Sequence, residues 1–76
     1  MKELVETIVK ELVEEKDQVE IEENRNGGEV NILIHVAESD KGRVIGVRGN
    51  IINAIRTISR ACAIKENVKV NIKIWE

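Results

Sequence analysis

Apolar residues in this chain of 76 residues follow two spacings that alternate along its length. In residues 2–16 they recur one and four positions apart, which places them on one face of a helix. In residues 18–24 and 68–75 they recur at every second position, which is the spacing of a strand. Residues 29–37 show the same alternation with Leu33 and Ala37 added, as in a central strand that is buried on both faces for part of its length. The helical spacing returns after Gly49, where an apolar stripe runs from Ile51 to Cys62. Helices and short strands must therefore share one small fold.

Turn signals between these segments indicate how the strands pair. Asn26-Gly27-Gly28 predicts a tight hairpin, so the first two strands should be antiparallel. Ser39-Asp40 offers side-chain oxygens that accept the first free amides of a helix, which should extend to about Ile45. Together with the helix after Gly49, this helix makes a crossover long enough for parallel pairing of the second and third strands. The sequence thus predicts one α+β domain over residues 1–76, in the order α-β-β-α-α-β, with a three-stranded mixed sheet covered on one face by three helices.

Two glycines three positions apart enclose the loop Gly46-Val47-Arg48-Gly49 between two predicted helices. Glycine permits backbone conformations that other residues adopt only at a cost, and it lets a ligand approach the main chain. Free amides at the start of the following helix face this space, with the positive end of the helix dipole behind them. A phosphate group suits such a site, although glycines also join helices for purely structural reasons. Other phosphate motifs do not fit, because the chain contains neither G-x-G-x-x-G nor a P-loop.

Charge is distributed unevenly, and the net value of −2 conceals this. Residues 1–29 carry ten acidic side chains against four basic ones, whereas residues 41–65 carry six basic side chains and no acidic one. Such an asymmetry favours a polyanionic partner near the glycine loop. The six bases are Lys41, Arg43, Arg48, Arg56, Arg60 and Lys65.

Several classes of function are excluded by what the chain lacks. Cys62 is the only cysteine and His35 the only histidine, so neither a disulfide nor a metal site is expected. Serines and His35 show no spacing typical of a nucleophile and its base, and we expect no enzyme and no cofactor. No apolar run approaches the roughly 20 residues of a membrane span, and charges interrupt the N-terminal segment. We therefore expect a cytoplasmic protein with no membrane partner.

The segment Gly42-Arg43-Val44-Ile45-Gly46-Val47-Arg48-Gly49, followed by Ile51-Ile52 and Ala54-Ile55-Arg56, resembles the core of a KH domain. The predicted order of elements resembles the bacterial type II arrangement, and the whole chain is similar to the stand-alone single-KH proteins of the KhpA type. RNA-binding folds that stack bases on aromatic platforms do not fit, because the chain has no Phe or Tyr.

The resemblance implies that the loop clamps the backbone of about four nucleotides of single-stranded RNA while the bases lie in an apolar groove beside it. Ile45 and Ile51 would be walls of that groove. Basic residues around the loop would supply most of the attraction. The full set of candidate RNA-binding residues is Lys41, Arg43, Ile45, Gly46, Val47, Arg48, Gly49, Asn50, Ile51, Asn53 and Arg56.

The loop departs from the family pattern in one respect that affects binding strength. Val47 and Asn50 stand where many family members have a basic residue, so Arg48 is the only charge inside the loop. We therefore expect weak affinity and little sequence preference, as in an RNA chaperone or post-transcriptional regulator. The alternative is a KH-fold module for protein assembly. The resemblance also implies, as partners, a second copy of the chain or a second KH-containing RNA-binding protein.

Two further side chains are open to more than one interpretation. His35 is predicted to be structural or partly exposed, and a groove contact near the loop is the alternative. Trp75 is predicted to cover a sheet edge or to lie in an oligomer contact rather than to stack on a base.

Overall fold

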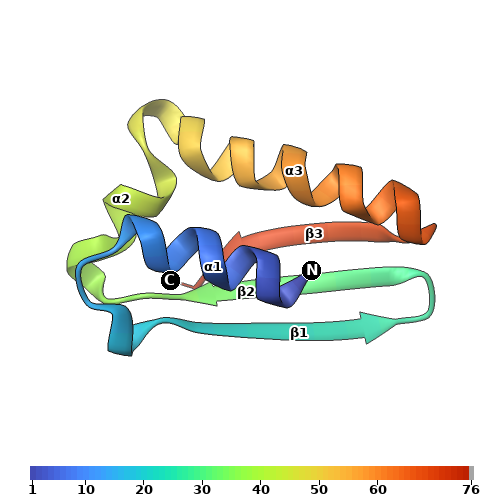
Figure 1. Ribbon diagram of the computed structural model, residues 1–76, viewed down its shortest axis with the longest axis horizontal. Coiled ribbons are helices and arrows are strands. Elements are labelled where there is room, and N and C mark those ends of the chain that lie inside the picture. The colour runs from blue at the N-terminus through green and yellow to red at the C-terminus, as the bar shows by residue number, and fades with distance from the viewer. Residues whose placement is uncertain (76) are drawn as a thin grey trace.

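A computed structural model describes residues 1–75 and confirms the predicted order of elements (Figure 1). Three short 3-10 turns, η1, η2 and η3, join the helices and strands. The bounds are α1 Lys2–Leu12, η1 Lys16–Gln18, β1 Glu20–Asn26, β2 Glu29–His35, η2 Glu38–Asp40, α2 Lys41–Ile45, η3 Val47–Gly49, α3 Asn50–Glu66 and β3 Lys69–Ile74.

The sheet has the order β1-β2-β3 and is mixed, as predicted. Strands β1 and β2 are antiparallel in a register that pairs Asn26 with Glu29 across the turn. The positive φ that this turn requires is taken by Gly27 (φ 65°). Strands β2 and β3 are parallel, with Ile32 opposite Ile72. The α2–α3 crossover therefore returns the chain to the far side of β2.

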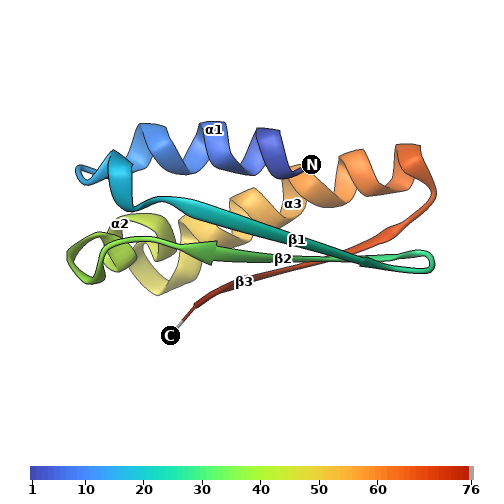
Figure 2. The same ribbon diagram turned by 90° about the horizontal axis from the view of Figure 1, so that it is seen from below.

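One core lies between the helices and one face of the sheet. The helices contribute Val5, Val9, Val44, Ile52 and Ile55, all of which are buried. Every second strand residue faces them, including Val30, Ile32, Ile34, Val70 and Ile72. Figure 2 shows α1 and the C-terminal half of α3 on the same side of the sheet. The opposite face is left without a helix, so three helices cover one face, as the alternating pattern predicted.

The first helix is shorter than its apolar spacing predicted. We expected a helix over residues 2–16, but α1 ends at Leu12 and Val13 is extended (φ −97°, ψ 158°). Val13 is nevertheless buried in the core. The amides of Glu14 and Glu15, which a longer helix would use internally, donate instead to the carboxylate of Asp40. The helix thus ends because of a contact between Glu15 and Asp40, which lie 25 positions apart in the sequence.

Candidate nucleic-acid interface

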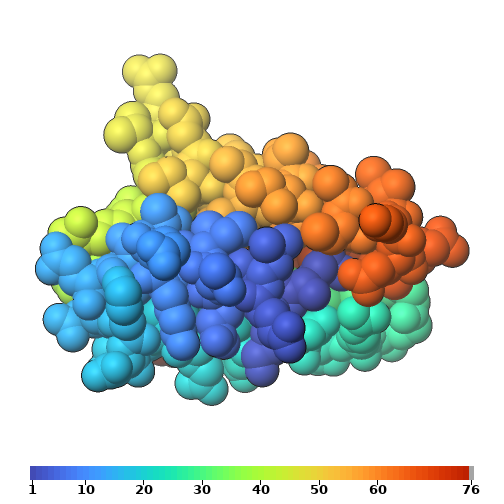
Figure 3. Space-filling view, viewed as in Figure 1, coloured from blue at the N-terminus to red at the C-terminus, as the bar shows by residue number. Residues whose placement is uncertain are grey.

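The glycine loop joins α2 to α3 through an unusual run of backbone conformations. Gly46 has φ 77° and ψ 177°, and Gly49 is left-handed (φ 75°, ψ 15°). Between them Arg48 is also left-handed (φ 55°, ψ 28°), a conformation that costs an ordinary L-residue about 1–2 kcal/mol. Figure 3 shows this segment, in yellow, standing out from the body of the molecule. The loop therefore presents its backbone and the exposed side chain of Val47 to solvent.

The two glycines serve different purposes. A Cβ atom on Gly46 would lie 2.7 Å from Cγ1 of Ile51 and 2.9 Å from the Ile51 backbone nitrogen, too close for any side chain. A Cβ atom on Gly49 would make only ordinary contacts, 3.6 Å from Nδ2 of Asn53 and 3.8 Å from Cγ2 of Ile52. Gly46 thus lets the loop pack against the start of α3, whereas Gly49 supplies a left-handed turn.

Backbone amides at the start of α3 lack side-chain caps. The N-cap residue Gly49 has no side chain to offer, and the first turn contains no acidic residue. Within the loop, the amide of Gly49 donates to the carbonyl of Gly46 (3.3 Å), and that of Asn50 donates to the carbonyl of Val47. The remaining first-turn amides and the positive end of a helix of 17 residues are suited to an anion.

A hollow lies beside the loop, where the ends of α2 and β3 meet α3. Its apolar lining is Ile45, Ile52 and Ile74, and its basic lining is Arg56 and Lys73. Ile45 thus lies where we expected a groove wall. Ile51, the other expected wall, packs at Gly46 instead and does not line this hollow. We did not predict Ile52 and Ile74 as walls of the groove, although the helical spacing around Ile52 and the strand spacing around Ile74 place both on inward faces.

Arg56 is fixed at the rim of this hollow by hydrogen bonds to neutral groups. Its Nε and Nη2 atoms donate to the carbonyl of Ile72 (3.2 and 3.1 Å), and Nη1 donates to Oδ1 of Asn53 (3.0 Å). Among residues 1–75 no carboxylate pairs with it, so its charge is not neutralised locally. Arg56 and Asn53, both predicted site residues, are therefore brought together with Ile45 near the loop.

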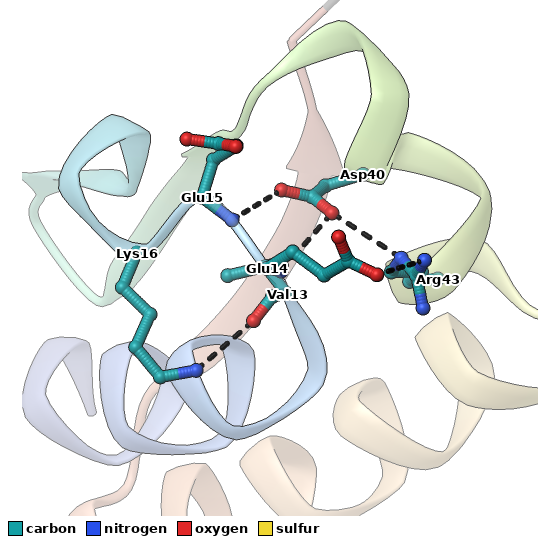
Figure 4. Close-up of polar contacts among 6 residues, drawn as sticks. All are labelled: Val13, Glu14, Glu15, Lys16, Asp40 and Arg43. Carbon is teal, nitrogen blue, oxygen red and sulfur yellow. Dashed lines mark hydrogen bonds and ion pairs between the residues drawn. The ribbon is translucent and has the colours of Figure 1, made fainter.

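Lys41 and Arg43 have acidic partners on neighbouring elements. Lys41 pairs with Glu38 (2.9 Å). Arg43 pairs with Glu14 (2.5 Å) and Asp40 (3.3 Å), as Figure 4 shows. The Arg43 side chain thus joins α2 to the end of α1. We expected these two bases to supply much of the attraction for a polyanion, and the structure shows that acids already partner both of them.

Asp40 has a different role from the predicted one. Its carboxylate does not cap its own helix, α2. The carboxylate is instead buried, with 1% of the residue exposed, and accepts from the amides of Glu15 (3.0 Å) and Glu14 (3.1 Å). The Glu15 amide is the main cause that lowers the pKa of Asp40, and the Glu14 amide and the charge of Arg43 act in the same direction, against desolvation. Asp40 thereby ties the end of α1 to the start of α2 (Figure 4).

His35 ends β2 and Trp75 follows β3, and neither side chain lines the hollow. Their rings stack with centroids 5.4 Å apart, and Nζ of Lys41 lies 5.8 Å from the centre of the indole ring. Nε2 of His35 also contacts Oε2 of Glu22. Trp75 therefore covers the end of β2. A groove contact by His35 near the loop, the alternative interpretation, does not fit this position.

Residues 1–75 contain neither a cluster of metal-binding side chains nor a membrane-spanning helix. No three side chains of the metal-binding kinds gather there, and no helix is both long and apolar enough to cross a bilayer.

A β-α-α-β core with a G-x-x-G loop between its helices, preceded by a helix and a strand, defines a type II KH domain. The chain belongs to the KhpA/KhpB KH-domain family, which matches residues 2–74. It is 43% identical over 74 residues to the RNA-binding protein KhpA of Clostridium acetobutylicum, covering 97% of this chain and 99% of the relative. Identity to the protein of the same name from Clostridium perfringens is 45% with the same coverage, and to that from Chlamydia trachomatis 38%, covering 100% of this chain and 97% of the relative. No solved structure matches significantly. Membership of this family confirms the prediction that the chain is not an enzyme.

Proposed function

We propose that this chain binds single-stranded RNA by clamping the backbone of about four nucleotides at the Gly46–Gly49 loop. The observation that carries the proposal is the loop itself, whose backbone protrudes in front of uncapped amides at the start of α3. Its relatives in two Clostridium species and in Chlamydia, named as RNA-binding proteins, support the same function.

Different parts of the site contact the backbone and the bases of the RNA. Phosphates lie against the α3 amides and Arg48, because these groups combine hydrogen-bond donors with positive charge. Bases enter the hollow lined by Ile45, Ile52 and Ile74, with Arg56 and Lys73 at its rim. Since Val47 adds no charge, binding is weak and little affected by base sequence. Such binding suits an RNA chaperone or a post-transcriptional regulator in the cytoplasm.

A double substitution in the loop tests this proposal. Val47→Asp with Arg48→Asp puts two acids on exposed positions, and Asp tolerates the left-handed conformation of Arg48 better than most residues. Loss of a charge-assisted contact of about 1.5–3 kcal/mol should weaken binding of a short single-stranded RNA at least about tenfold. The loop glycines stay in place, so the domain should still fold.

The matched control carries the same change in net charge on the outer face of α1. Lys2→Asp with Thr7→Asp alters two exposed residues there. The control should bind RNA almost as the unchanged chain does. Equal affinity of the loop variant and the unchanged chain, in fluorescence anisotropy at low salt, would refute the proposal.

Assembly with another protein is a second candidate, favoured by two exposed apolar side chains on α3. Ile58 is 45% exposed and Ile64 80% exposed. A second copy of the chain or a second KH-containing RNA-binding protein would be the partner. Sizing at several concentrations beside an RNA titration separates the two candidates, because a pure assembly module would associate without binding RNA.

A further inference from the structure

The hollow beside the loop does not end at Arg56 but continues along the outer edge of β3. Arg56 and Lys73 line both this hollow and a neighbouring one, which also includes Arg60, Asn71 and Ile72. That one in turn shares Arg60, Val70 and Asn71 with a third, at the C-terminal end of α3. We call the part beyond Arg56 the distal groove, and it is lined by Arg60, Ala63, Ile64, Val68, Lys69, Val70 and Asn71.

The distal groove is basic at both of its walls. Arg60 is exposed on α3 and Lys69 is exposed on β3, facing the groove from opposite sides. Within residues 1–75 neither forms an ion pair, and the same holds for Lys73. The hollow between the loop and the distal groove is lined by one acidic residue, Glu29, which accepts a hydrogen bond from Asn31 (3.4 Å). The charge of the groove therefore favours an anionic occupant.

A protein strand is the competing occupant, because β3 is an edge strand. The amides of Lys69 and Trp75 donate inward to Gly28 and Ile34 of the β2 side, which leaves the backbone of Ile72 facing outward. The guanidinium of Arg56 already occupies the carbonyl of Ile72. Lysines on an edge strand also discourage pairing with another strand. These features disfavour a strand and leave a polyanion.

We propose that the distal groove binds the RNA nucleotides that follow those held at the Gly46–Gly49 loop, so that one strand lies along β3 from Ile74 toward Val68. The inference rests on the proposed RNA binding and extends its substrate to longer single strands. Six residues of β3 at about 3.3 Å each give a track of ~20 Å. Arg60 and Lys69 are the phosphate contacts of this track.

Two RNA lengths and one pair of substitutions test the inference. Unstructured RNAs of about four and about eight nucleotides are titrated at several salt concentrations. Arg60→Gln with Lys69→Gln should weaken binding of the longer RNA several-fold and leave the shorter RNA unchanged. For the longer RNA, the slope of log affinity against log salt should fall by about 1.4, or 0.7 for each lost contact. The matched control is Lys2→Gln with Lys10→Gln on α1, which should affect neither RNA.

The outcomes distinguish this inference from the proposed function. Equal affinity of the unchanged chain for both RNAs would overturn the distal groove while leaving the loop intact. The distal groove would also be overturned if the variant with Arg60→Gln and Lys69→Gln bound the longer RNA with unchanged affinity. A change only in the self-association of this variant would overturn it too, and would indicate a protein strand as the occupant. Loss of binding only for the longer RNA supports it. Failure of the unchanged chain to bind either RNA would overturn both proposals.

Discussion

Alanine at Gly46 should destabilise the domain far more than alanine at Gly49, although both glycines have positive φ. At Gly46 the new methyl group would lie 2.9 Å from the backbone nitrogen of Ile51, so the first turn of α3 must shift. Backbone strain of about 1–3 kcal/mol adds to overpacking of about 1–3 kcal/mol, and we expect a loss of about 3–4 kcal/mol in the free energy of unfolding.

At Gly49 the methyl group meets nothing closer than 3.6 Å, so only the left-handed conformation counts against it. That strain of about 1–2 kcal/mol is partly offset by about 0.4–1 kcal/mol from the less flexible unfolded chain. The expected loss is about 1 kcal/mol.

Urea titration followed by circular dichroism measures both values, and thermal melting checks them. For a domain of this size each kcal/mol lowers the melting temperature by about 4–8 °C, so Gly46→Ala should melt at least ~12 °C below the unchanged chain. Gly49→Ala should melt no more than ~8 °C below it. Equal destabilisation by the two substitutions would refute the separate roles of the glycines.

Three further predictions concern single side chains. Arg48→Asn should leave the free energy of unfolding unchanged or slightly higher, because Asn tolerates the left-handed conformation better, yet it should weaken RNA binding in the same anisotropy assay. Ser59→Ala should stabilise the domain by about 1 kcal/mol in urea titration, because the buried hydroxyl of Ser59 has no hydrogen-bond partner among the described residues; destabilisation would contradict this. The stability contributed by Asp40 should be full above its ordinary pKa of 3.8 and lost as the pH falls through its lowered folded-state pKa. Asp40→Asn should therefore destabilise the domain at pH 7, and the gap between the two urea midpoints should narrow on acidification below about pH 4; a constant gap would contradict this.

Local patterns in the sequence predicted most of the fold. Alternation in β3 assigned Val70 and Ile72 to the buried face, and the structure confirms this. The end of α1 could not be predicted in this way. Val13 continues the helical spacing, but Asp40, a residue distant in sequence, takes the amides that the helix would need next.

The sequence predicted the position of the loop in the candidate site, but not which of the basic side chains around it have acidic partners. Gly46-Val47-Arg48-Gly49 is contiguous, so its place between two helices could be read directly. Whether a basic side chain has an acidic partner depends on tertiary contacts, and Arg43 pairs with Glu14, which lies 29 positions earlier in the segment that follows α1. Likewise Lys73 reaches the hollow only because β3 ends beside α2 and α3.

Backbone amide chemical shifts, followed during titration with a single-stranded RNA, show directly whether the RNA binds at the Gly46–Gly49 loop. We expect the largest and earliest changes on Gly46–Ile52, followed by the residues around Arg56 and Lys73. The chemical shifts of the amides around His35 and Glu22, whose side chains lie on the opposite face of the sheet, should not change. Changes centred on that opposite face, with the loop unaffected, would contradict RNA binding at the Gly46–Gly49 loop.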